Sequence, residues 1–60
     1  MYRVAIFSQR NGEIQYELFN NDFNSYNEAR DYFEYIQGYL QNVRIELIDQ
    51  SDKIVSVFEN

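Results

Sequence analysis

Histidine, cysteine and proline are all absent from this chain of 60 residues. Without cysteine there is no disulfide framework, no thiolate nucleophile and no zinc-finger spacing. Without histidine, the commonest metal ligand and general base is also missing. The simplest expectation is therefore a cytoplasmic protein that holds no metal and no cofactor.

Long apolar runs and a signal-peptide pattern are missing as well. The chain starts with Met1, Tyr2 and Arg3 and alternates at once, without a basic head followed by an apolar stretch. No segment approaches the roughly 18 apolar residues that span a bilayer. We therefore expect neither secretion nor membrane insertion.

Basic residues are scarce. Five Lys and Arg stand against ten Asp and Glu, which gives a net charge of −5. This balance disfavours direct contact with DNA or RNA, because the counterion-release contribution to binding has the wrong sign. A basic protein partner is the more natural expectation, although the same acidity also serves to keep an ordinary small domain in solution.

Aromatic side chains, by contrast, are abundant. Six Tyr and five Phe are present among the 60 residues. A chain this rich in contact surface and this poor in reactive side chains is typical of a protein that binds another molecule. Its length fits one domain, in which a small core needs nearly every apolar residue.

Two stretches that alternate between apolar and polar residues predict β-hairpins, at residues 2–19 and 43–59. In the first, Asn11 and Gly12 permit a two-residue or a three-residue loop, and a slip of one residue exchanges the core face for the surface. The second hairpin is expected to turn through three residues, 50–52. For the first we also expect three residues, since this register gathers the most apolar side chains on one face: Val4, Ile6, Ile14, Tyr16 and Leu18.

A helix is expected between the hairpins, over residues 26–41. Ser25 and Glu28 have the spacing of a capping box, and apolar residues then recur at helical intervals. Gly38 is the one position that disfavours helix, so an earlier end near it is the alternative. Four antiparallel strands in one sheet with the helix packed on one face form a two-layer α+β fold of order ββαββ. The order of the strands in the sheet stays open.

The face that the helix leaves uncovered is the first candidate surface. With the registers above, it carries the residues of a predicted oligomer interface, namely Phe7, Phe19, Ile48, Ile54 and Phe58. Large exposed apolar patches are uncommon on monomers, so this face predicts a homodimer or a docked partner. Scattered surface hydrophobes, or an error in register, would give the same pattern.

The exposed side of the helix is the second candidate surface. Its predicted partner-binding residues are Glu28, Asp31, Glu34 and Tyr35. Three carboxylates on one strip suit a groove lined by Lys or Arg, and tyrosine is enriched among the residues that dominate interface energies. A solvated helix face that binds nothing shows the same composition.

No catalytic residue is predicted. The acidic residues lie on strands or on an exposed helix face, so no carboxylate pair is desolvated as acid–base catalysis requires. The exposed phenylalanines also lack the frame of Lys and Arg that accompanies base-stacking sheets. The leading hypothesis is a non-catalytic acidic regulator or inhibitor that binds a basic protein, for example in the groove of a nucleic-acid-processing protein, in analogy with small acidic mobile-element or phage proteins. The alternative is a structural subunit that associates with itself through the uncovered sheet face.

Overall fold

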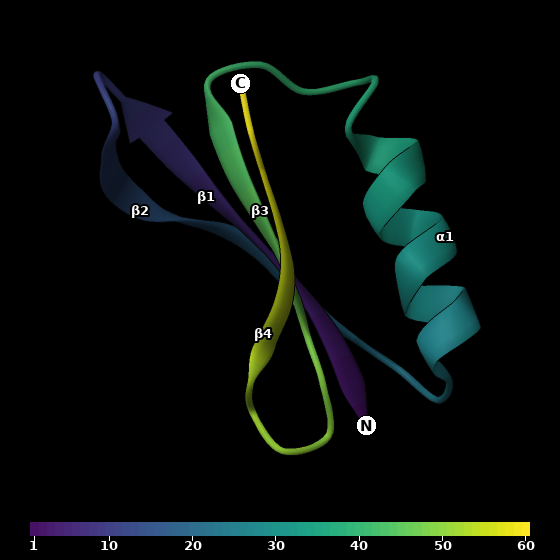
Figure 1. Cartoon of the computed structure of the whole chain (residues 1–60). Coiled ribbons are helices and arrows are strands. Elements are labelled where there is room, and N and C mark those ends of the chain that lie inside the picture. The colour runs from purple at the N-terminus through teal and green to yellow at the C-terminus, as the bar shows by residue number, and fades with distance from the viewer.

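The computed structural model describes all 60 residues and contains β1 (Tyr2–Arg10), β2 (Glu13–Phe23), α1 (Tyr26–Ile36), β3 (Val43–Ile48) and β4 (Ile54–Glu59) (Figure 1). The four strands form one antiparallel sheet in the order β2-β1-β3-β4, and α1 packs on one face. The predicted ββαββ architecture is confirmed. The strand order places β1 and β3 at the centre and leaves β2 and β4 as edges. With 11 residues, α1 is shorter than a membrane span requires.

The core lies between α1 and the two central strands. The β1–β3 ladder places Ile6 opposite Ile45, so the two side chains share the face toward α1. From the helix, Ala29 and Phe33 meet them one turn apart. All seven core residues come from these three elements: Val4, Ile6, Ala29, Phe33, Val43, Ile45 and Leu47.

The first hairpin turns through Asn11 and Gly12 alone, so the predicted three-residue loop is wrong. Arg10 pairs with Glu13, and the two turn residues have φ values of 54° and 80°. This is the type I′ geometry that Asn-Gly favours, because its twist matches that of the flanking strands. Local turn chemistry, rather than the hydrophobic pattern, therefore set the length of the loop.

Two bulges in β2 change which of its residues face the helix. The strand contains one extra residue at Gln15 and another at Leu18. Each bulge moves the following residues to the opposite face relative to strict alternation. As a result Phe19 lies opposite Ile6, and its ring centroid is 5.9 Å from that of Tyr32 in α1. The prediction that Phe19 belongs to the uncovered face is wrong.

The second hairpin turns through the predicted three residues, 50–52. The Asp49 N–H donates to the Lys53 carbonyl at 2.9 Å, and the Asp49 carboxylate accepts the Lys53 N–H at 3.0 Å. Asp52 has a φ of 64°, the left-handed conformation that such a loop needs at its last position. Here turn chemistry and hydrophobic pattern agree.

A bulge in β4 follows this turn. Val55 is the extra residue, so that Phe58 lies opposite Ile45 and packs against the core. The prediction that Phe58 belongs to the uncovered face is therefore wrong, for the same physical reason as for Phe19. Ile54 precedes the bulge and pairs with Ile48 on the uncovered face, as predicted.

The helix begins where the capping box predicts, but it ends early. Ser25 Oγ accepts the Glu28 N–H at 3.2 Å and donates to the Glu28 carboxylate at 3.1 Å. After Ile36 the N–H groups of Gly38 and Tyr39 donate to carbonyls three residues back, at 3.4 and 3.1 Å, which tightens the chain into turns. The predicted helix end at residue 41 is wrong, and the low helix propensity of Gly38 accounts for the early end.

Replacing Gly12 with Ala tests the type I′ turn. At this position φ is 80°, yet an added Cβ would meet no atom within 4 Å, so the cost comes from the backbone alone. We expect a loss of about 1 kcal/mol in the free energy of unfolding, read from the urea midpoint at constant m-value. Asn11→Gly, which tolerates the same left-handed conformation, is the control. Equal stability of Gly12→Ala and the native chain would contradict the turn type.

Candidate functional site

The exposed side of α1 brings all four predicted partner-binding residues together. Glu28, Asp31, Glu34 and Tyr35 are exposed, while Ala29 and Phe33 of the same helix are buried against the sheet. Successive residues rotate by 100° around a helix, so the four side chains form one continuous strip on the side away from the core. We call these residues the acidic strip. Figure 1 shows that no other element covers this side of α1.

The three carboxylates of the strip differ in how far they are already engaged. Glu28 is held by Ser25 in the capping box. An Asp31 oxygen lies 3.3 Å from the guanidinium of Arg30. Glu34 forms no ion pair and no side-chain hydrogen bond within the protein. Its full charge is therefore available to a partner.

Tyr35 lies beside Glu34 and stacks on another exposed tyrosine. The ring centroids of Tyr35 and Tyr39 are 4.7 Å apart, and the two residues are 60% and 67% exposed. The predicted helix over residues 26–41 would place Tyr39 at the margin of the core. Since α1 ends at Ile36, Tyr39 instead follows a turn and meets Tyr35 on the surface. The pair forms an aromatic end to the acidic strip.

The uncovered sheet face does not assemble the predicted oligomer interface. Of the five residues, Phe7, Ile48 and Ile54 lie on this face, whereas Phe19 and Phe58 lie on the helix side. Ile48 is only 7% exposed, so it has little surface to offer. The aromatic patch expected from strict alternation is therefore not formed.

An ion network occupies part of the same face. The Arg44 guanidinium lies 2.8 Å from a Glu46 oxygen and 3.3 Å from a Glu59 oxygen. The hydrogen bond that the Arg44 guanidinium donates to Glu46 is the main cause of the raised pKa of Arg44. Because Glu46 is nearly buried, this pairing also satisfies a carboxylate that would otherwise be costly there. The charges are engaged with one another and break up the apolar surface around Phe7.

Apolar side chains are exposed on both edge strands, with Ile54, Val55 and Val57 on β4 and a larger set on β2. All residues of this strand except Phe23 are exposed. Three of them were expected in the core, namely Ile14, Tyr16 and Leu18. The tip of the hairpin extends away from α1, so the short helix cannot cover it (Figure 1).

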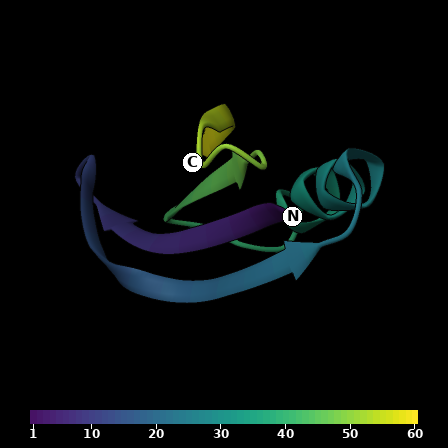
Figure 2. The same ribbon diagram turned by 90° about the horizontal axis from the view of Figure 1, so that it is seen from below.

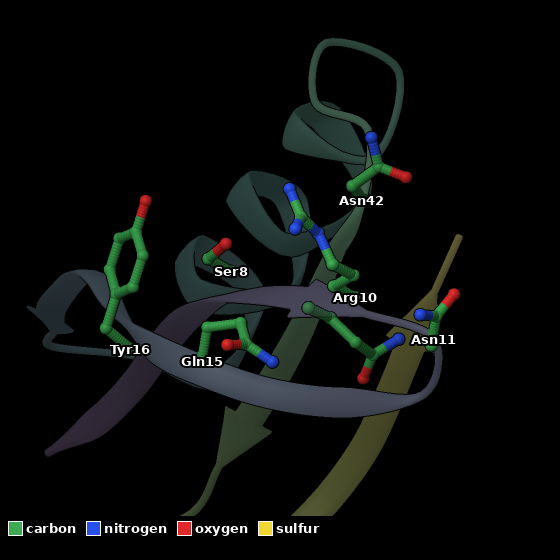
Figure 3. A pocket seen from close by; sticks show the side chains of 7 residues that line it. Ser8, Arg10, Asn11, Gln15, Tyr16 and Asn42 are labelled. Carbon is green, nitrogen blue, oxygen red and sulfur yellow. The ribbon is translucent and has the colours of Figure 1, made fainter.

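A polar hollow of about 580 Å³ lies near the tip of this hairpin (Figure 3). Ser8, Arg10 and Tyr16 rise from the same side of the hairpin, and Asn42 lies beside them in the loop before β3. Gln9 also lines the hollow, and its Oε1 atom is buried without a hydrogen-bond partner. The full lining is Ser8, Gln9, Arg10, Asn11, Gln15, Tyr16 and Asn42. It offers amides, hydroxyls and one guanidinium but no carboxylate.

Known proteins give no guide to the role of these surfaces. Comparisons of the chain with protein-family models, with curated proteins and with solved structures find no match. No three His, Cys, Asp or Glu side chains gather as a set of metal ligands. The surfaces from which a function can be inferred are the acidic strip, the edge of β2 and the polar hollow.

Proposed function

We propose that this protein is a non-catalytic, acidic regulator or inhibitor, which binds a basic protein partner in the cytoplasm through the acidic strip of α1. The stacked pair of Tyr35 and Tyr39 beside the unpaired carboxylate of Glu34 is the observation that carries the proposal. Exposed aromatic rings next to a free charge combine apolar contact with charge recognition in one place. The polar hollow also combines an exposed ring, Tyr16, with a charge, but that charge is the Arg10 guanidinium, which does not suit a basic partner.

The spacing of the strip supports a partner whose own ligand is a nucleic acid. Glu28, Asp31 and Glu34 follow one another at intervals of three residues, which corresponds to steps of about 4.5 Å along the helix axis. This is of the same order as the axial spacing of phosphates along one DNA strand, about 3.4 Å. A groove whose Lys and Arg bind phosphates would meet the strip with complementary charge.

Capture of the partner from lysate of the native host tests the proposal. Retention on the immobilised protein should be strong at low ionic strength and fall steeply as salt is added, because the contact depends on exposed charges. A short DNA duplex in excess should displace the captured partner. Capture that persists unchanged at high salt, or that survives the duplex, would contradict groove occupation.

Glu34→Gln and Glu13→Gln form a matched pair for the same proposal. Each removes one exposed carboxylate that has no ion pair, but only Glu34 belongs to the acidic strip. We expect Glu34→Gln to weaken the complex about tenfold, equivalent to about 1.4 kcal/mol, and Glu13→Gln to change the dissociation constant less than about twofold. Titration calorimetry with the captured partner measures both. Equal effects would mean that only net charge matters and that the strip is not the contact.

A further inference from the structure

The outer edge of β2 lacks most of the features that prevent edge strands from pairing. The strand is 11 residues long and contains neither Lys nor Pro. Short length, Lys, Pro and bulges are the usual means of keeping an exposed edge unpaired. Of these β2 has only its two bulges, and both lie before Phe19. Figure 2 shows β2 as the outermost strand, with nothing beyond it.

The bulges confine regular geometry to residues 19–23. In this stretch the ladder with β1 runs without interruption, from Phe19 opposite Ile6 to Phe23 opposite Tyr2. The chain then leaves the sheet toward the cap of α1. An added strand can therefore pair regularly with about five residues and no more.

This stretch is complementary to itself. A two-fold axis through Asn21 places Phe19 opposite Phe23 of a second copy on the helix side, and Asn20 opposite Asp22 on the other side. Directly opposed residues must share a face, which excludes axes that fall between residues. An axis at Asp22 would oppose two carboxylates, and an axis at Asn20 would draw the bulge at Leu18 into the ladder.

From this geometry we propose that two copies of the protein pair antiparallel through residues 19–23 of β2, with the two-fold axis at Asn21. The inference goes beyond the proposed function and stands without it. The two four-stranded sheets become one sheet of eight strands, with both helices on the same side. A second copy suits this edge better than a basic strand, because the stretch holds a single acid, Asp22, and self-pairing gives that acid an amide partner.

The dimer is expected to be weak and to strengthen with salt. A five-residue antiparallel overlap supplies about four to six backbone hydrogen bonds, and interfaces of this small size give transient association. Each protomer carries a net charge of −5, so the copies repel one another over a distance. Screening reduces this repulsion, which is the opposite of the salt dependence expected for the basic partner.

Sedimentation equilibrium of the full chain, from micromolar to millimolar concentration, tests the proposal. We expect the weight-average mass to rise from 7.3 kDa toward twice that value, and to rise at lower concentration in 1 M than in 0.1 M sodium chloride. A mass that stays at 7.3 kDa throughout would overturn the proposal and leave the edge free for another occupant.

Charge substitutions at Asn20 test the register itself. Asn20→Lys places a cation opposite Asp22 of the second copy, and Asn20→Asp places a carboxylate there. Because each dimer contains this pair twice, we expect the dissociation constants of the two variants to differ about tenfold or more, with Asn20→Lys the tighter. Asn27→Lys and Asn27→Asp, on exposed helix, make the same changes in charge away from the edge.

The outcomes separate this proposal from the proposed function. If the Asn20 and Asn27 pairs shift self-association equally, net charge and not the β2 register is responsible, and the proposal is wrong. Glu34→Gln alters the acidic strip and not β2. It should change the dissociation constant of the dimer by no more than Asn27→Lys does. A protein that dimerises as described but captures no basic partner would support this inference while refuting the proposed function.

Discussion

Replacing Ile45 with Ala is expected to remove half or more of the free energy of unfolding. Ile45 is fully buried at the centre of the sheet, between Ile6 of β1 and Phe58 of β4. A buried Ile→Ala substitution costs about 2–5 kcal/mol, from lost transfer energy and from the cavity that remains. A domain of this size holds only about 3–9 kcal/mol in total. Urea unfolding followed by circular dichroism measures the loss.

Val57→Ala is the control for this substitution. Val57 is an aliphatic strand residue like Ile45, but it is 43% exposed and lies on the uncovered face opposite Glu46. Its truncation should cost well below 1 kcal/mol, because little apolar surface leaves the core. A difference of less than about 1 kcal/mol between the two variants would contradict the position of the core between α1, β1 and β3.

Replacing Tyr35 with Ala is expected to weaken binding of the basic partner about thirtyfold, which corresponds to the roughly 2 kcal/mol that marks an interface hot spot. The substitution removes the ring next to Glu34 and leaves Tyr39 without its stacking partner. The free energy of unfolding should change by less than about 0.5 kcal/mol, since the ring is mostly exposed. Surface plasmon resonance with the captured partner gives the affinity.

Tyr16→Ala provides a matched comparison for this prediction. Tyr16 is 61% exposed, almost the same as Tyr35, but it lies on β2 at the polar hollow. Its truncation should leave partner affinity within about twofold. If Tyr16→Ala weakens the complex as much as Tyr35→Ala does, the contact extends to the hairpin and the acidic strip is not its centre.

The parts of the fold that sequence reasoning predicted correctly depend on local chemistry or on simple alternation. Ser25 and Glu28 define the start of α1 through two hydrogen bonds within one turn of helix. On β1 and β3, strict alternation between apolar and polar residues places Val4, Ile6 and Ile45 in the core. The acidic strip was predicted from the helical periodicity of α1, which places its carboxylates on the side away from the buried residues.

The errors in assigning phenylalanines to a sheet face have one common cause, which is that bulges interrupt alternation. The two-residue turn at Asn11 and Gly12 leaves Ile14 on the uncovered face. The bulge at Gln15 then turns Tyr16 to the helix side, and the bulge at Leu18 turns Phe19 there. Nothing in the side chains of Gln15 or Leu18 marks them as bulge positions. Phe19 and Phe58 were therefore assigned to the wrong face of the sheet.

The exposed apolar residues of β2 and the position of Tyr39 were not predicted. The sequence of one strand does not show how far a helix will cover it. Tyr16 has the pattern of a core residue and lies on the helix side opposite Ser8, but α1 ends at Ile36 and does not reach the hairpin tip. A helix to residue 41, as predicted, would keep Tyr39 at the margin of the core. A helix that ends before Gly38, as the low helix propensity of glycine favours, leaves Tyr39 on the surface beside Tyr35.

Amide chemical-shift mapping by NMR decides whether the acidic strip is the partner-binding surface. The isotope-labelled chain is titrated with the captured partner, and the shifted amides are placed on the structure. We expect shifts and line broadening along α1 from Glu28 to Tyr35 and at Tyr39. Changes confined to the uncovered sheet face around Phe7 and Ile54, with α1 unaffected, would contradict it.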